Sequence, residues 1–337
     1  MLTLIMTGCA QPLKPQQRDD PLIGQIVDGH SREVITFGQL IERAASSDVV
    51  YLAERHDNTE HHQNQLTILA ALIEQGRKPV VGFEFFDIGQ TSYLMQYVDA
   101  KPSSMSFNSG AKSLSAEDRL RRQLGWTQRS DQDWNYYFQL IELARIHQLP
   151  VFGSDLPASL RLRLSRNGPQ QLTAVERQQL SLKPLSEDDY KRFMVERFTD
   201  AHCGWSSEPL MEQLYRTWYE RNYRMAASVV AMAIAEPTGE VGAVATDPQV
   251  AGPVVLILGA GHSEYNRAVV EQVAEMAPQL KQLNIGLQEI AIEAQPLAEY
   301  IEGGSVVEQS FAPRHDLFWF SQRQNYLDHC AELMKAN

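Results

Sequence analysis

The sequence is poor in the features that several common protein classes require. It has only three cysteines in 337 residues, Cys9, Cys203 and Cys330, which are too few and too scattered for a disulfide framework or a paired-thiolate zinc site. Lys and Arg total 30 against 42 Asp and Glu, so the net charge of -12 disfavours binding to nucleic acid. No internal run approaches the roughly 20 apolar residues of a membrane-spanning helix.

Familiar catalytic motifs are missing as well. The run ERHDNTEHH lacks two histidines at i and i+4 around a glutamate, so it does not match a zinc-protease helix. The stretch GAGHSE has Glu264 where a dinucleotide fingerprint needs its third glycine. No Gly-x-Ser-x-Gly elbow of a serine hydrolase is present.

What the chain does contain is a series of short, β-branched apolar runs. With 43% hydrophobic residues, the chain can bury a full core. Helix-like spacing separates the first four runs, which predicts an α/β fold: a mostly parallel sheet with flanking helices. The predicted strands begin at Val49, Pro79, Pro150, Val254 and Ile285.

A long polar stretch between the third and fourth strands has no strand signal of its own. We expect residues 158–250 to form an inserted helical subdomain, with residues 25–157 and 251–337 forming the α/β domain. This predicted subdomain includes the helix-like segment PLMEQLYRTWYERNYRMAASVVAMAIA.

The N-terminus resembles a bacterial lipoprotein precursor. The run MLTLIMTGC ends in a lipobox-like Met-Thr-Gly-Cys, so we expect residues 1–8 to be a signal remnant and Cys9 to be lipidated. Residues 9–24 are polar and read as a lipid-anchored tether. Ala10 suits sorting to the outer membrane with the protein on its periplasmic face. A plain disordered N-terminus is the alternative.

Titratable side chains stand at the carboxyl ends of the predicted strands. Asn58 or Thr59 is expected to cap a helix that runs to about Gly76 and points His62, but not His61, into the core. Because open parallel sheets bind ligands at these ends, we expect one polar strand-end site. Its predicted members are Glu54, His56, Asp57, His62, Glu84, Asp155 and His262. Each of them alone could equally be a structural cap or a hydrogen-bonded core residue.

Aromatic and arginine side chains crowd a second region. The simplest interpretation is an amphipathic helix that buries its aromatics under a charged face. Arginines beside exposed aromatics would also suit a flat, carboxylated ligand such as haem, whose iron a Tyr phenolate can ligate. The region contains Trp126, Trp134, Tyr136, Tyr137 and Phe138, with Arg121, Arg122, Arg129 and Arg145 around them.

Taken together, these segments resemble the ChaN-like family of haem-binding lipoproteins within the Tiki superfamily. The matching segments are AERHDNTEHHQNQ from Ala53, EFF at Glu84, a Trp-Trp-Tyr series, GSDLP from Gly153, and the G-x-G-H strand end at Gly259. The chain departs from the family pattern at three positions: Ala53 replaces a glycine, Asp155 an asparagine, and Asn222 an aspartate.

The resemblance implies an α/β domain with a helical subdomain that binds haem at the outer membrane, in some members as a homodimer with stacked haems. It implies iron ligation by tyrosine, for which Tyr137 is the matching position, with Trp134, Trp126 and Arg129 beside the haem. The implied partners are haem, the membrane through its lipid anchor, and an outer-membrane haem receptor.

A hydrolase is the alternative that the strand-end residues leave open, motivated by the esterase and protease branches of the superfamily. Glu54 or Glu84 would act as general base with His56 and His262 as partners, directly or through a bound metal of unknown identity. The resemblance favours a binding protein over an enzyme.

Overall fold

The computed structural model describes residues 19–100, 114–204, 207–234, 251–326 and 330. These residues form one sheet of eight strands in the order β2-β1-β8-β7-β3-β6-β4-β5. The strands from β8 to β5 are parallel, and the short β1 and β2 join one edge as antiparallel strands. The bounds are β1 (Ile26–Asp28), β2 (Val34–Ile35), β3 (Val49–Glu54), β4 (Lys78–Asp87), β5 (Val151–Asp155), β6 (Ala251–Gly259), β7 (Gln282–Glu289) and β8 (Leu317–Ser321).

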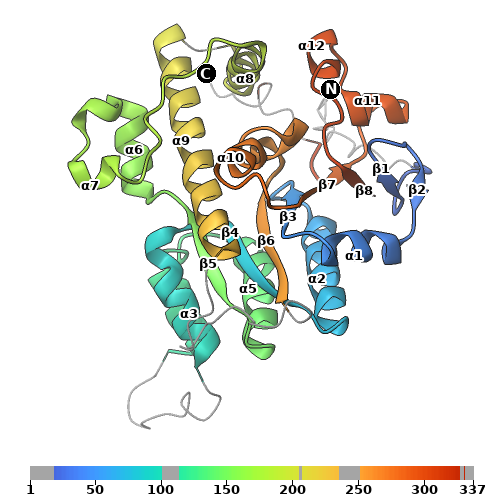
Figure 1. Cartoon of the computed structure of the whole chain (residues 1–337), viewed down its shortest axis with the longest axis horizontal. Helices are drawn as coiled ribbons and strands as arrows, with labels where there is room; N and C mark the ends of the chain where they lie inside the picture. Colours follow the sequence, from blue (N-terminus) through green and yellow to red (C-terminus); the bar gives the residue numbers. More distant parts are fainter. Residues whose placement is uncertain (1–18, 101–113, 205–206, 235–250, 327–329, 331–337) are drawn as a thin grey trace, which may run out of the picture.

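Helices cover both faces of this sheet (Figure 1). On one face lie α1 (Phe37–Ala45), α2 (Thr59–Glu74), α3 (Thr91–Asp99), α4 (Ala116–Gln123) and α5 (Asp131–Ile146). The other face is covered by the C-terminal half of α9 (Glu208–Ala233) and by α10 (Val269–Met276). Along β3, Val50 and Leu52 point to the first layer, whereas Val49 and Tyr51 point to the second. Burial on both faces explains why the strands are continuously apolar, and the predicted fold class is confirmed.

Between β5 and β6 the chain is helical in its described part. It forms α6 (Ala158–Asn167), the single turn Pro169–Gln171, α7 (Ala174–Arg177), α8 (Asp189–Ala201) and α9. The N-terminal half of α9 packs Tyr215 and Trp218 against Tyr190 and Phe193 of α8. Helix α8 and the N-terminal half of α9 lie beyond the carboxyl end of the sheet (Figure 1), while the C-terminal half of α9 packs on the second face of the sheet. The division into domains stays a prediction.

The predicted strands differ from the observed ones mainly at the C-terminal side of the sheet. The strand from Ile285 ends as β7 at Glu289, although the apolar pattern continues to Ala294. The neighbouring strand β8 ends at the same level, since the last residue of β7, Glu289, pairs with the last residue of β8, Ser321. Strands β1, β2 and β8 were not predicted. Strands β1 and β2 have only three and two residues, too few to show a strand pattern. The C-terminal part also contains α11 (Leu297–Glu302) and α12 (Val306–Gln309).

The N-terminus of α2 forms as predicted. Asn58 caps it by accepting hydrogen bonds from the amides of Glu60 and His61, at 2.9 and 3.2 Å. Gly76 follows the helix with φ +78°, a conformation that favours glycine. The predicted inward face was too narrow: His61 is as fully buried as His62, because β8 and the chain after it cover that side.

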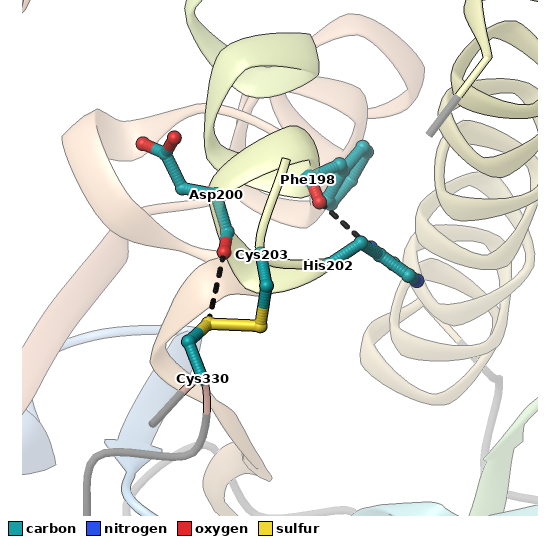
Figure 2. The surroundings of a disulfide bond; sticks show 5 residues. All are labelled: Phe198, Asp200, His202, Cys203 and Cys330. Atoms are coloured by element: carbon teal, nitrogen blue, oxygen red, sulfur yellow. Dashed lines mark hydrogen bonds between the residues drawn. A yellow bond between two sulfur atoms is a disulfide. The ribbon is translucent and has the colours of Figure 1, made fainter. Parts of the chain in front are cut away.

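A disulfide joins Cys203, after α8, to Cys330 near the C-terminus (Figure 2). The two residues are 127 positions apart in the chain, and their Cα atoms are 5.5 Å apart. This bond was not predicted, because pairing depends on proximity that the spacing of cysteines does not reveal.

Candidate functional site

A cavity of about 970 Å³ opens at the carboxyl end of the sheet. One wall consists of residues at the carboxyl ends of β3, β6 and β7 and just after them, among them His56, Gly259 and Glu289. The opposite wall consists of α8 and α9, which contribute Phe198 and Trp218. The volume is at the upper end of the roughly 300–1,000 Å³ of small-molecule sites, so the cavity can hold a ligand of that class.

Glu54 is at the centre of the polar network beneath this cavity. Its buried carboxylate accepts hydrogen bonds from Tyr137 Oη at 2.5 Å and Gln65 Nε2 at 2.5 Å. It also contacts His56 Nδ1 at 3.0 Å, and His62 Nδ1 lies 3.3 Å away. Burial alone would raise the pKa of Glu54, but the hydrogen bond from His56 and the neighbouring histidines lower it below its usual value. The carboxylate therefore stays ionised and orients its neighbours.

His56 is the part of this network that reaches the cavity. Its side chain is 50% exposed and lines the cavity wall, while Phe85 touches it edge-on with ring centroids 4.5 Å apart. Glu54 holds Nδ1, and Nε2 makes no hydrogen bond to any residue that the structure describes. Desolvation works against the charged imidazolium, yet the carboxylates of Glu54, Glu84 and Asp57 raise the pKa of His56 above 6.5. The arrangement presents one free ring nitrogen, as an iron ligand or a general base requires.

Arg221 of α9 connects the other strand ends. Its guanidinium donates to Glu84 Oε1 at 2.7 Å and to Asp155 Oδ2 at 2.9 Å. Glu84 also accepts from the amide of Gly259 at 2.7 Å and lies 3.1 Å from His262 Nε2. Burial would raise the pKa of Glu84, but these positive partners hold it well below its usual range. The structure thus brings Glu54, His56, Glu84, Asp155 and His262 together in one place.

Asp57 and the buried histidines have other roles. The carboxylate of Asp57 is 45% exposed and accepts from Asn325 at 3.0 Å, so it lines the cavity without joining the network. His61 accepts from the Arg55 amide through Nδ1 and contacts Ser321 Oγ through Nε2. Burial lowers the pKa of His61 to about 3, which keeps this residue neutral and structural. His62 stacks on Tyr136 with centroids 4.0 Å apart.

The aromatic region differs from the exposed surface that a flat ligand would need. Trp126 and Trp134 are 5% and 2% exposed, and both belong to the core. The simplest interpretation, that the aromatics are buried, is confirmed, and the alternative of exposed aromatics is wrong. Trp134 lies on α5 and Trp126 in the segment before it, and both pack into the core, where burying large rings is favourable. Arg129 stacks over Trp126 at 4.9 Å from its centroid and lines a separate surface depression of about 480 Å³.

Tyr137 belongs to the strand-end network and not to a surface. It is 2% exposed, and its hydroxyl donates to Glu54. Burial and the adjacent carboxylate raise the pKa of this phenol well above its usual value. As described, the phenol is neutral and shielded from the cavity. The structure does not test whether Tyr137 ligates iron, which stays a prediction.

Two site residues, Arg221 and Gln65, were not predicted. Nothing in the local pattern tells a paired arginine from a solvated one. Gly259 was quoted as part of a motif but was given no role. Gly259 matters by its lack of a side chain: a Cβ there would lie 2.7 Å from His56 Cε1. The G-x-G-H motif at this strand end was the sequence signal that could have pointed to Gly259.

The described residues contain neither a metal-ligand cluster nor a membrane-spanning helix. Within residues 19–100, 114–204, 207–234, 251–326 and 330, no group of three or more His, Cys, Asp or Glu side chains is arranged to hold a metal ion. No helix in these ranges has the length and apolar character needed to cross a membrane.

Comparison with solved structures shows similarity of fold. ChaN of Campylobacter jejuni, described with cofacial haem binding, superposes with a TM-score of 0.60 at 17% identity, covering 87% of this chain and 95% of that one. The type III effector HopBA1 reaches 0.42 at 12% identity, with 91% and 100% covered. A mutant erythromycin esterase in its open conformation reaches 0.41 at 12% identity, with 78% and 77% covered. The last two are too distant to carry an argument.

The family assignment comes from the sequence. A comparison with curated proteins finds no match. Residues 40–273, more than half of the 337-residue chain, match the family described as haem-binding uptake, Tiki superfamily, ChaN. The chain therefore belongs to the ChaN family of haem-binding uptake proteins.

Proposed function

We propose that this protein binds haem in the cavity at the carboxyl end of the sheet and holds it as cargo for uptake or transfer. The observation that carries the proposal is His56: the residue lines the cavity, its Nδ1 is held by Glu54, and its Nε2 has no hydrogen-bond partner among the described residues. A carboxylate on the far nitrogen orients a histidine and makes it a better iron ligand.

The lining of the cavity fits the rest of the ligand. Met194, Phe198 and Trp218 supply apolar contacts for a porphyrin face, and several arginines line the same space and can pair with its carboxylates. Tyr137, implied by the family resemblance, is the alternative iron ligand within this proposal. For Tyr137 to ligate, its phenol must leave Glu54 and lose its proton, against the raised pKa. His56 must lose only the Nε2 proton that it carries when charged, and it keeps its contact with Glu54, so we assign ligation to His56.

We place the protein at the periplasmic face of the outer membrane, anchored through lipid on Cys9. Cys9 and the signal remnant lie outside the described residues. Disulfides persist in oxidising compartments such as the periplasm, and Cys203–Cys330 is of this kind. Labelling with a radioactive fatty acid, which a Cys9→Ala variant should not take up, tests the anchor.

Haem titration of the purified protein tests the binding role. We expect a Soret band that saturates with added haem and that changes form in a His56→Ala variant. An absence of any Soret change at stoichiometric haem refutes the proposal.

We also propose that haem-loaded protein forms a homodimer and exchanges haem with an outer-membrane receptor. Sedimentation with and without haem tests the dimer, and capture of solubilised outer-membrane proteins on the haem-loaded protein tests the receptor.

One observation favours a second function, hydrolysis. A buried, ionised Glu54 that orients a half-exposed His56 is also the geometry of a general base that activates water. A screen of ester and peptide substrates separates the two functions. Turnover that His56→Ala abolishes would establish the enzyme, whereas a protein that turns over none of them and binds haem is a carrier.

A further inference from the structure

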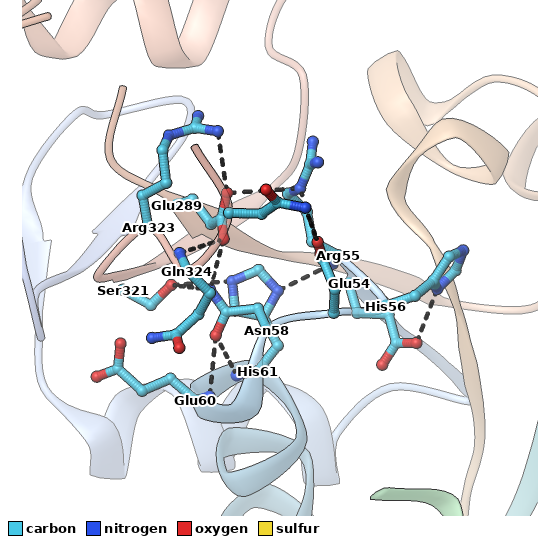
Figure 3. A network of polar contacts seen from close by, with 12 residues as sticks. Glu54, Arg55, His56, Asn58, Glu60, His61, Glu289, Ser321, Arg323 and Gln324 are labelled. Atoms are coloured by element: carbon cyan, nitrogen blue, oxygen red, sulfur yellow. Dashed lines mark hydrogen bonds and ion pairs between the residues drawn. The ribbon is translucent and has the colours of Figure 1, made fainter. Parts of the chain in front are cut away.

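Two arginines share one buried carboxylate beside the cavity (Figure 3). Glu289, at the end of β7, has a fully buried side chain. Its Oε1 accepts from Asn58 Nδ2 at 2.8 Å and from the amide of Gln324 at 3.0 Å. Arg55 Nε and Arg323 Nη1 approach its other oxygen, Oε2, at 3.4 and 3.3 Å.

These contacts leave most guanidinium donors unused. No partner within hydrogen-bonding geometry is found for Oε2 of Glu289 among the described residues, so the two arginines are held by charge more than by saturated hydrogen bonds. Arg323 uses its Nε on the Ile290 carbonyl at 3.0 Å. Arg55 has one further carboxylate nearby, Asp57, at 3.9 Å. Each guanidinium has five N–H donors, and both arginines line the cavity.

The local charge favours an anion. Two guanidiniums face one buried carboxylate, and the Asp57 carboxylate is 45% exposed, so that solvent screens its pairing with Arg55. A ligand carboxylate would complete the pairing and could be held by both N–H groups of one guanidinium.

The chain after β8 positions Arg323. The amide of Gln322 donates to Glu60 at 2.8 Å, and Asn325 donates to Asp57 at 3.0 Å. Further along, Cys330 is tied to Cys203 beyond the opposite wall of the cavity. These contacts hold Arg323 beside Arg55, which directly precedes His56 in the turn after β3.

We propose that Arg55 and Arg323 form a carboxylate subsite that binds one propionate of the porphyrin. The inference rests on the proposed haem binding and adds which residues recognise the acidic edge of the ligand. The turn after β3 then supplies two neighbouring contacts, the iron ligand from His56 and a carboxylate contact from Arg55.

The test compares haem with haem dimethyl ester, in which both carboxylates are esterified, in the same dilute detergent. Arg55→Gln and Arg323→Gln should each weaken haem binding by roughly 10- to 100-fold, as expected for a hydrogen bond to a charged group. Neither change should alter affinity for the ester. Arg192→Gln is the matched control: it removes an arginine from an exposed ion pair on α8, outside the cavity lining, and should bind haem as wild type does.

The outcomes separate the subsite from the proposed function. Variants that bind haem with wild-type affinity, or that lose haem and ester equally, overturn the subsite while haem binding stands. A wild-type protein that binds neither porphyrin overturns both. Because Arg55 is 52% exposed, its replacement is not expected to affect folding, so a fold defect in Arg323→Gln would still leave the test decisive.

Discussion

A single methyl group at Gly259 would test the role of His56 without removing any functional group. An alanine Cβ there would lie 2.7 Å from His56 Cε1, 2.9 Å from His56 Nε2 and 3.5 Å from Glu84 Oε2. Carbon contacts are optimal at about 3.5–4.0 Å, so the imidazole must move by about 1 Å. Gly259 has φ -66° and ψ 140°, which alanine adopts without strain.

That movement breaks the hydrogen bond that orients His56. Its Nδ1 is 3.0 Å from Glu54, and a further 1 Å takes the pair beyond hydrogen-bonding distance. Since the ring is half exposed, we expect the free energy of unfolding to fall by only about 1 kcal/mol. Haem affinity should fall more, roughly 10- to 100-fold, as is typical when a metal ligand loses its orienting partner.

Haem titration followed by the Soret band, together with urea unfolding, measures both quantities. Gly261→Ala is the matched control, because a Cβ there meets nothing within 4 Å in the same turn. Wild-type haem affinity in Gly259→Ala would refute the assignment of His56. A loss of stability above about 3 kcal/mol would instead indicate that the surrounding structure moved, because a lost hydrogen bond does not cost that much.

Three further predictions concern single sites. Tyr137→Phe should keep the haem spectrum and lower the free energy of unfolding by about 1–2 kcal/mol, because Glu54 loses one donor; loss of a tyrosinate spectrum would assign the iron to Tyr137. Cys203→Ser should lower that free energy by about 2–5 kcal/mol, because the bond to Cys330 closes a long loop, and wild-type stability in urea would contradict this. His61 has its pKa lowered by burial to about 3, below its value near 6.5 in the unfolded chain, so its contribution is complete above pH 6.5 and is lost as pH falls toward 3. Between pH 6.5 and 3 the free energy of unfolding should therefore drop by about 1.4 kcal/mol for each unit by which the pH falls. The His61→Gln variant should show a flatter slope in urea titrations at pH 7, 6 and 5.

The periodicity of the sequence determined the architecture. Apolar runs of strand length alternating with helical spacing predict parallel strands covered on both faces, and the observed β3, β4, β5 and β6 follow them. Asn58 and Gly76 marked the ends of α2 through local chemistry alone, a side-chain cap and a positive φ. The carboxyl ends of parallel strands lie at one edge, and this is why strand-end carboxylates and histidines could be expected together.

Only the tertiary structure decided how these groups are partnered. Arg221 comes from a helix in the inserted segment and joins Glu84 to Asp155, and no local pattern announces such a contact. Tyr137 was matched to the iron-ligating tyrosine of the family, and only the packing of α5 on the sheet shows that its hydroxyl points to Glu54. The direction of a side chain on a helix depends on which face is buried, and an aromatic-rich helix such as α5 leaves that choice to packing. Packing also decides which distant residues come close together. The bond between Cys203 and Cys330 forms because the fold places their Cα atoms 5.5 Å apart, which the sequence does not reveal.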